Sequence, residues 1–118
     1  MSMLDSPLLG SLEHYLDVSA KRQELIVGNM ANVDTPGYRT RDLDFESELR
    51  RAASASDPEP QVIEVQGLLE RPDGNNVSID REALLLAKTQ LEFRMGAQLL
   101  RHKFQTLESV IKEGGSTA

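Results

Sequence analysis

Apolar residues recur at alternating spacings of three and four in two long segments, one at each end of the chain. In the first segment the repeat passes through Leu12, Leu16, Ser19, Gln23, Ile26, Met30 and Val33. That spacing predicts a helix from Pro7 to Asn32, with Ser6 as its N-cap and Pro7 at its first position. Gly28 near the end of this helix is expected to let another backbone approach closely.

The last third of the chain continues the same alternation over a longer stretch, so we expect a second helix from Asp80 to Lys112. Ser78 is expected to cap this helix, and Gly114–Gly115 to end it. The repeat itself consists of Leu86, Gln90, Phe93, Ala97, Leu100, Phe104, Leu107 and Ile111, with a flanking apolar row of Leu84, Leu91, Met95 and Leu99. These side chains cannot all face one partner helix. Surplus apolar surface of this kind is typical of subunit contacts, so an oligomer or filament is expected.

The segment between the helices is expected to be extended or irregular. Polar and apolar residues alternate in Arg39–Phe45, which predicts an extended piece, and Phe45–Ala53 fits a short helix. Residues 54–60 have the composition of a loop. A strong turn signal follows at residues 72–76, and the pattern allows a short β-hairpin spanning Gln61–Val77.

These patterns together predict a mainly α-helical chain whose two terminal helices pack as an antiparallel, coiled-coil-like hairpin. We expect three parts: residues 1–38 with the first helix and its turn, residues 39–77 as a variable middle segment, and residues 78–118 with the second helix and a short tail. The residues predicted to form the helix seam and the subunit contacts are Leu12, Leu16, Ile26, Met30, Leu86, Phe93, Leu100, Phe104, Leu107 and Ile111.

The exit from the first helix is the most specific local pattern. Pro36 has no backbone N–H to donate and pushes Thr35 out of helical geometry, while Gly37 supplies the positive φ that a type II turn requires. Asn32 is expected either to cap the helix end or to adopt left-handed geometry. The chain should therefore leave the helix in one fixed direction, which is more typical of an assembly component than of an enzyme.

Composition narrows the classes of function. The chain has 118 residues, of which 39% are hydrophobic and 4% aromatic, so a narrow seam between helices suits it better than a thick core. A net charge of −6 argues against nucleic acid and anionic membranes as main partners. There is no cysteine for disulfides or thiolate metal sites. No stretch approaches the ~20 apolar residues that a membrane span needs, and no cleaved signal peptide is expected.

Catalytic, metal and cofactor sites are not expected. The two histidines, His14 and His102, lie on different predicted helices, where each is expected to be a surface residue. Residues 73–82 fail as a calcium loop because Val77 and Ser78 fall where an oxygen ligand and a glycine are needed, so we interpret them as a turn and a helix cap. A solvated acidic edge that pairs with neighbouring arginines is expected from Asp42, Asp44, Glu46 and Glu48.

Two segments together resemble the flagellar basal-body rod proteins. The first lies within Leu25–Tyr38 and resembles a signature shared by rod, hook and hook-associated proteins; its residues are Asn29, Asn32, Asp34, Thr35, Pro36, Gly37 and Tyr38. The second precedes the long C-terminal helix, and its matching residues are Asp73, Gly74, Asn75, Asp80 and Glu82. Residues 50–71 match no part of the family pattern.

The resemblance, which is strongest to proximal rod proteins, implies a structural subunit of the axial drive shaft in the bacterial periplasm. It also implies export by the flagellar type III apparatus without a cleaved signal. The implied partners are further copies, other rod proteins such as the FlgC type, the FliE-type adaptor and the export gate, with no nucleic acid, small-molecule substrate or membrane span. The alternative from another class is a soluble helical-hairpin regulator or chaperone that binds a protein partner; a small hydrolase is the weakest candidate.

Overall fold

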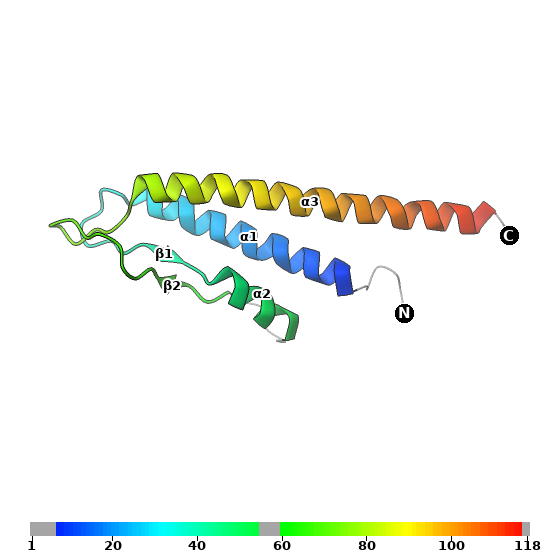
Figure 1. The fold of residues 1–118 in the computed structure, drawn as a ribbon, viewed down its shortest axis with the longest axis horizontal. Helices are drawn as coiled ribbons and strands as arrows, with labels where there is room; N and C mark the ends of the chain where they lie inside the picture. The colour runs from blue at the N-terminus through cyan, green and yellow to red at the C-terminus, as the bar shows by residue number, and fades with distance from the viewer. Residues whose placement is uncertain (1–6, 55–59, 117–118) are drawn as a thin grey trace.

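Three helices and two short strands make up the chain in a computed structural model that describes residues 7–54 and 60–116. In chain order these are α1 (Pro7–Ala31), β1 (Arg41–Asp42), α2 (Phe45–Ser54), β2 (Ile63–Glu64) and α3 (Ile79–Ser116). The molecule is elongated, with extents of 72 × 27 × 17 Å, and α3 runs along most of its length (Figure 1).

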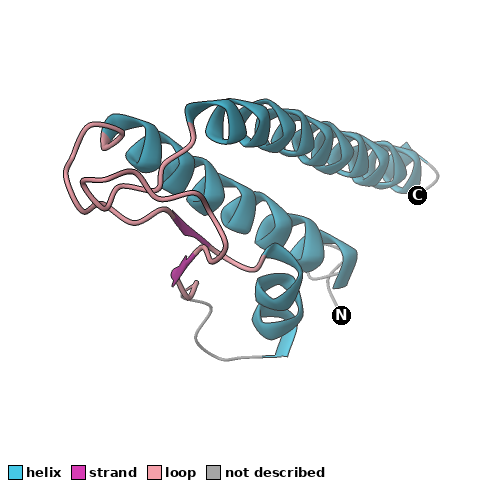
Figure 2. Cartoon of the chain, turned by 60° about the vertical axis from the view of Figure 1, so that its left-hand side comes forward, coloured by secondary structure: helices cyan, strands magenta, loops and turns pink. Residues whose placement is uncertain are grey.

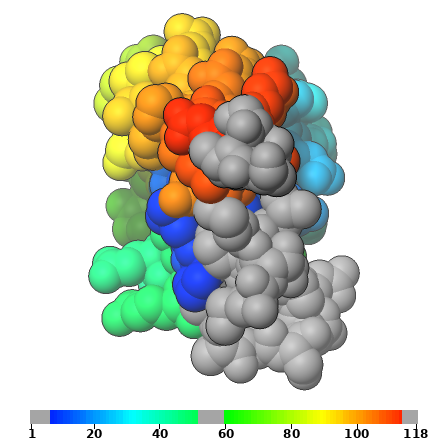
Figure 3. Space-filling model, turned by 90° about the vertical axis from the view of Figure 1, so that its right-hand side faces the viewer, coloured from blue at the N-terminus to red at the C-terminus, as the bar shows by residue number. Residues whose placement is uncertain are grey.

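The terminal helices form the predicted antiparallel hairpin. α3 begins beside the end of α1 and runs back along it, with α2 on the opposite side of α1 (Figures 1 and 3). The helices are in tight contact at Gly96, where an added Cβ would lie 2.9 Å from the ring of Tyr15. The expectation that Gly28 provides the close approach is wrong, because no atom lies within 4 Å of a Cβ built there.

The ends of the two long helices follow the predicted capping chemistry only in part. α1 begins at Pro7 as predicted and ends at Ala31, one residue early, whereas the predicted N-cap Ser6 lies outside the described residues. Ser78 caps α3, since its Oγ accepts a hydrogen bond from the N–H of Arg81 at 3.3 Å. The prediction that Gly114–Gly115 ends α3 is wrong: the helix continues to Ser116, because glycine weakens a helix by only about 1 kcal/mol and does not forbid it.

The middle segment contains the predicted extended piece and short helix, but not the predicted β-hairpin. β1 pairs with β2 in antiparallel register, with Arg41 opposite Glu64 and Asp42 opposite Ile63 (Figure 2). The prediction of a hairpin within Gln61–Val77 is therefore wrong. Its strand residues, those of β2, pair with β1, which precedes α2 in the chain. The predicted loop at 54–60 falls almost entirely outside the described residues.

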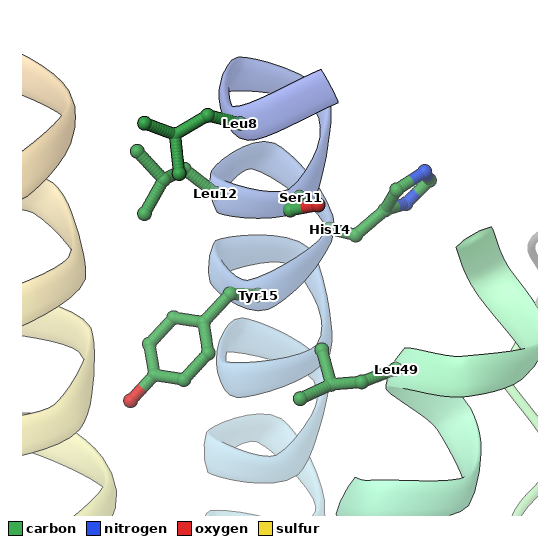
Figure 4. A pocket seen from close by; sticks show the side chains of 6 residues that line it. All are labelled: Leu8, Ser11, Leu12, His14, Tyr15 and Leu49. Atoms are coloured by element: carbon green, nitrogen blue, oxygen red, sulfur yellow. The ribbon is translucent and has the colours of Figure 1, made fainter. Parts of the chain in front are cut away.

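α2 packs on the N-terminal half of α1 through aromatic and aliphatic side chains. The rings of Tyr15 and Phe45 meet edge to face, with centroids 5.4 Å apart. Tyr15 and Leu49 also border a hollow of about 290 Å³ (Figure 4), whose remaining lining residues are Leu8, Ser11, Leu12 and His14. Tyr15 is thus the contact point of all three helices.

The predicted acidic edge is only partly solvated. Asp44 and Glu46 are exposed, whereas Asp42 and Glu48 are buried. Glu48 accepts a hydrogen bond from Arg51 at 2.7 Å, as expected, and a second from the backbone N–H of Gln61 at 3.0 Å. The interpretation of Asp42 and Glu48 as solvated residues is wrong because elements distant in the sequence cover them.

The interior is more polar than apolar. The buried apolar side chains of the described residues are Leu9, Val18, Ile26, Leu43, Val77 and Leu107. The buried polar ones are Ser19, Asn29, Thr40, Asp42, Glu48, Asn75, Asn76, Glu82 and Thr89. Buried polar groups destabilise a fold unless they are hydrogen-bonded, so the geometry of their bonds fixes how the segments meet.

Candidate functional site, the junction of the two motifs

The two sequence motifs lie against each other at the end of the molecule where α1 stops and α3 starts (Figures 1 and 2). We call this region, residues 29–41 together with residues 71–82, the motif junction. Its contacts join parts of the chain that are 35 to 53 positions apart. The junction therefore fixes both the helix hairpin and the direction in which the middle segment leaves it.

Asn29 is the hub of the motif junction. Its side chain is 1% exposed and uses all of its hydrogen-bonding capacity. The amide Nδ2 donates to the carbonyl of Arg41 at 2.8 Å and to Oε2 of Glu82 at 3.1 Å. The amide Oδ1 accepts from the N–H of Arg41 at 3.0 Å and from the hydroxyl of Tyr38 at 3.2 Å. One residue at the end of α1 thereby binds the turn, β1 and α3.

A buried chain of charges continues from this hub. Glu82 is fully buried, and its other oxygen, Oε1, accepts a hydrogen bond from Nη1 of Arg81 at 2.8 Å. Nη2 of Arg81 lies 4.0 Å from Oδ2 of Asp42. Arg22 of α1 donates two hydrogen bonds to the Asp42 carboxylate, each at 3.1 Å. Bidentate arginine pairs add geometric specificity, so this chain of charges holds α1, β1 and α3 in one arrangement.

The predicted type II turn is present at the exit of α1. The N–H of Tyr38 donates to the carbonyl of Thr35 at 3.2 Å, and Gly37 has φ of 75°. Asn32 caps the helix by donating to the carbonyl of Gly28 at 2.8 Å, and its Oδ1 accepts from the Thr35 hydroxyl at 3.0 Å. The alternative of left-handed geometry at Asn32 is wrong, because only glycines among the described residues have positive φ.

The turn of the second motif packs against this first turn. The N–H of Gly37 donates to the carbonyl of Asp73 at 2.9 Å. Gly74 has φ of 87°, and a Cβ added there would lie 3.4 Å from the Cα of Gly37. The two glycines therefore meet backbone to backbone, and each also supplies the positive φ that its own turn needs.

Two consecutive asparagines complete the contact between the motifs. Asn75 is fully buried and donates from Nδ2 to the carbonyls of Asn32 at 2.9 Å and Thr35 at 2.8 Å. Oδ1 of Asn76 accepts from the N–H of Thr40 at 2.7 Å, and the Thr40 hydroxyl donates to the carbonyl of Asn76 at 3.2 Å. The interpretation of residues 73–82 as a turn and cap alone is therefore wrong.

Most of the predicted motif residues lie in this junction. From the first motif Asn29, Asn32, Thr35, Gly37 and Tyr38 make the contacts described, while Asp34 and Pro36 are exposed. From the second motif Asp73, Gly74, Asn75 and Glu82 take part, while Asp80 is exposed. Residues that the sequence did not single out also take part: Thr40, Arg71, Asn76 and Arg81 lie in the junction, the last two within the second motif segment, and Arg22 and Asp42 lie beside it. Their polar side chains interrupt no helical repeat, so no local pattern marks them.

The two histidines line two different hollows, although Leu8 and Leu12 border both of them. His14 lines the hollow beside α2, and His102 lines a separate hollow of about 150 Å³ between α1 and α3. Within residues 7–54 and 60–116 no cluster of three or more His, Cys, Asp or Glu side chains has the arrangement of a metal site. Likewise, no helix in the described part of the chain has the length and hydropathy to cross a membrane.

The predicted seam residues divide between the inside and the outside of the hairpin. Ile26 and Leu107 are buried, and those of intermediate exposure are Leu12, Leu16, Met30, Leu86 and Leu100. Phe93, Phe104 and Ile111 are exposed. The flanking row of α3 is more exposed still: Leu84, Leu91, Met95 and Leu99 are each between 54% and 72% exposed. We call these four residues the α3 apolar row.

No family model matches the chain. A flagellar basal body rod protein FlgB of Salmonella typhimurium is 31% identical over an alignment of 122 positions, which covers 84% of this chain and 88% of that protein. The FlgB of Borrelia hermsii is 31% identical and covers 83% of this chain and 90% of its own. The FlgB of Bacillus subtilis is 25% identical over 94% of this chain and 98% of its own length.

These relatives come from distant bacteria and align over nearly their whole length, including both motifs of the junction. They are named as structural rod components, and none supports the alternative of a soluble regulator or chaperone. The chain belongs to the FlgB family of flagellar basal body rod proteins, and it is a structural subunit of the basal-body rod and not an enzyme.

Proposed function

We propose that the chain enters the rod through the α3 apolar row, which packs against helices of neighbouring rod subunits. The observation that carries this proposal is the exposure of four large apolar side chains on one side of α3, led by Leu84 at 72%. α1 does not cover them. Burial of these side chains by a neighbour would be favourable by about 25 cal/mol for each Å² of apolar surface removed from water. The exposed seam residues Phe93, Phe104 and Ile111 lie on another side of α3 and form a separate apolar surface.

The motif junction has a mechanical role in this proposal. A rod that transmits torque needs subunits whose segments keep fixed angles under load. Asn29, Glu82 and Asn75 hold the exit of α1 and the start of α3 by buried hydrogen bonds, which would be left unsatisfied if the segments moved apart. The junction thereby sets which neighbour the middle segment, residues 39–77, can reach.

Family membership supports an assignment of the neighbours and the location. The chain assembles with other rod proteins of the basal body. We further assign as its neighbours copies of itself, rod proteins of the FlgC type, the FliE-type adaptor and the export gate. Its place is the periplasmic part of the rod, reached through the flagellar export apparatus without a cleaved signal. These assignments rest on the resemblance of the two motifs to proximal rod proteins.

The test introduces two charges into the α3 apolar row at positions that do not contribute to the packing of α1 on α3. We expect Leu91→Glu with Met95→Glu to leave the isolated chain as helical as the wild type by circular dichroism, because both side chains are more than half exposed. The same variant should be absent from purified basal bodies, and cells that carry it should not swim. Ala83→Glu, an exposed substitution on another side of the same helix, is the matched control. Incorporation of the double variant at the wild-type level would refute the proposal.

A further inference from the structure

We propose that two copies of this chain pair through helix faces that their own hairpins leave free: the outward face of α1 in one copy meets the outward face of α3 in the next. In this pairing the helices are antiparallel, Asp17 lies opposite Arg101, and Glu24 lies opposite Arg94. The inference rests on the proposed function, which requires contacts between copies, and it names the residues that select the partner and set its register.

The face offered by α1 is acidic. Its residues are spaced alternately four and three apart and are all exposed; they are Glu13, Asp17, Ala20, Glu24 and Val27. Glu13 and Asp17 form no ion pair or hydrogen bond with any described residue. Glu24 has only a loose contact with Lys21 at 3.6 Å, and its side chain is 72% exposed. These carboxylates are free to meet a partner.

The face offered by α3 is basic at the corresponding spacing. It also alternates four and three, through Gln90, Arg94, Ala97, Arg101 and Phe104. Arg94 and Arg101 are exposed and, among the described residues, have no carboxylate partner. Arg94 borders an open hollow of about 460 Å³ that Gln23, Gln90, Phe93 and Ala97 also line. Because Gln23 belongs to α1 of the same copy, this hollow lies along the edge of the α1–α3 seam. Its concave surface lies beside the basic row and suits the insertion of another helix.

The two faces match when they are laid antiparallel. Ala20 then lies opposite Ala97, and these small side chains let the helix backbones approach closely at the centre of the seam. Asp17 and Glu24 are seven residues apart, as are Arg94 and Arg101, so both ion pairs form in the same register, roughly 10.5 Å apart at ~1.5 Å per residue. Because the chain carries a net charge of −6, two copies repel each other over most of their surfaces. The basic row of α3 is a surface that attracts the acidic face of another copy.

This pairing is intermolecular. Within one copy the contact of Tyr15 with Gly96 sets the helix register, which places Ala20 level with Leu91. Ala97 is six residues further along α3, roughly 9 Å at ~1.5 Å per residue. A neighbour that satisfies both ion pairs is therefore displaced along the helix axis. Displaced copies that join different faces give a head-to-tail contact, which propagates as an open helical array and does not close as a symmetric pair.

The first test reverses the charges in the full chain expressed in its bacterium. Asp17→Lys with Glu24→Lys, and separately Arg94→Glu with Arg101→Glu, should each lower incorporation into purified basal bodies at least tenfold. The four substitutions together restore attraction in reversed polarity, so incorporation should return to within about twofold of the wild type. The control for Asp17→Lys with Glu24→Lys is Glu46→Lys with Glu64→Lys, which makes the same change of charge on exposed residues away from both faces. Failure of the fourfold variant to recover would overturn the pairing.

The second test measures the register directly. The chain has no cysteine, so Ala20→Cys with Ala97→Cys introduces one unique pair. Mild oxidation of assembled basal bodies should then give cross-linked dimers and longer ladders, because opposed Cα atoms of an antiparallel seam fall within disulfide range. The control pair, Ala20→Cys with Ala87→Cys, is displaced by ten residues and should give none.

The outcomes separate this inference from the proposed function. Absence of cross-links, cross-linking within one copy, or normal assembly of the charge-reversed variants would overturn the pairing. The proposed function would stand in each of these cases if Leu91→Glu with Met95→Glu still prevents assembly. If that apolar-row variant also assembles normally, the proposed function fails as well.

Discussion

The side-chain amide of Asn29 donates a hydrogen bond to the carboxylate of Glu82 at 3.1 Å, although the two residues are 53 positions apart and neither is more than 1% exposed. One residue belongs to the first sequence motif and the other to the second. The bond therefore joins the end of α1 to the start of α3 in an environment where an unpaired group is strongly unfavourable.

We expect Asn29→Asp to destabilise the chain by about 3–5 kcal/mol at pH 7, since it sets a second buried carboxylate against Glu82 and removes the donor to the Arg41 carbonyl. Urea unfolding followed by circular dichroism measures this loss. The control is Gln90→Glu, a substitution at an exposed position of α3. A variant as stable as the wild type at pH 7 would contradict the prediction.

The motif junction also marks the limit of what the sequence predicts. Helix periodicity and the Pro36–Gly37 pair act over a few residues, so both helices and the type II turn were predictable. From the sequence, Glu82 stands out only as a residue of the second motif, whereas in the structure it is buried and bonded to both Asn29 and Arg81. Pairing across more than 40 residues leaves no local period, and only the motif resemblance pointed to this region.

The variant Gly37→Val tests whether rod assembly depends on the angle at which the chain leaves α1. A non-glycine residue at φ of 75° costs on the order of 1–3 kcal/mol, and a β-branched side chain is among the least tolerated there. No atom lies within 4 Å of the added Cβ, so Gly37→Val acts through the backbone and not through a clash. We expect normal expression of this variant with loss of rod assembly, measured in purified basal bodies and by swimming in soft agar.

Gly28→Ala is the matched control for that experiment, since Gly28 lies inside α1 and also has nothing within 4 Å of an added Cβ. It should swim normally and gain about 0.5–1 kcal/mol in stability from the better helix propensity of alanine. Normal swimming by Gly37→Val would remove the special role assigned to the turn.

Gly96→Ala should destabilise the chain even though alanine favours helix. The added methyl group would lie 2.9 Å from two ring atoms of Tyr15 and 3.1 Å from a methyl group of Leu16, so α1 and α3 must separate. Overpacking of this kind costs about 1–3 kcal/mol, which exceeds the propensity gain. Thermal unfolding should show a lower midpoint, and Tyr15→Leu in the same chain should recover part of it. A raised midpoint for Gly96→Ala alone would show that the helices are not in contact there.

The contrast between the two glycines shows why packing was less predictable than helix position. Gly28 and Gly96 each lie within a helical repeat, and periodicity alone does not say which one faces the other helix. The answer depends on where α1 and α3 cross, which the buried polar contacts of the motif junction set. The same reason explains why Phe93 and Phe104, predicted for the seam, are exposed in a single copy.

Asp44 makes the start of α2 sensitive to acid. Its carboxylate accepts hydrogen bonds from the Ser47 hydroxyl at 2.8 Å and the Ser47 N–H at 3.3 Å, and these bonds lower the pKa of Asp44 below its ordinary value of 3.8. Because the folded pKa is the lower one, the cap stabilises α2 fully above the unfolded pKa and is lost as pH falls through the folded pKa. Hydrogen exchange at the Ser47 amide should therefore speed up only in strong acid. Asp44→Asn should remove that pH dependence, while Glu46→Gln, exposed in the same turn, should retain it. An Asp44 titration midpoint at or above 3.8 in the folded chain, measured by NMR, would show that the cap does not form.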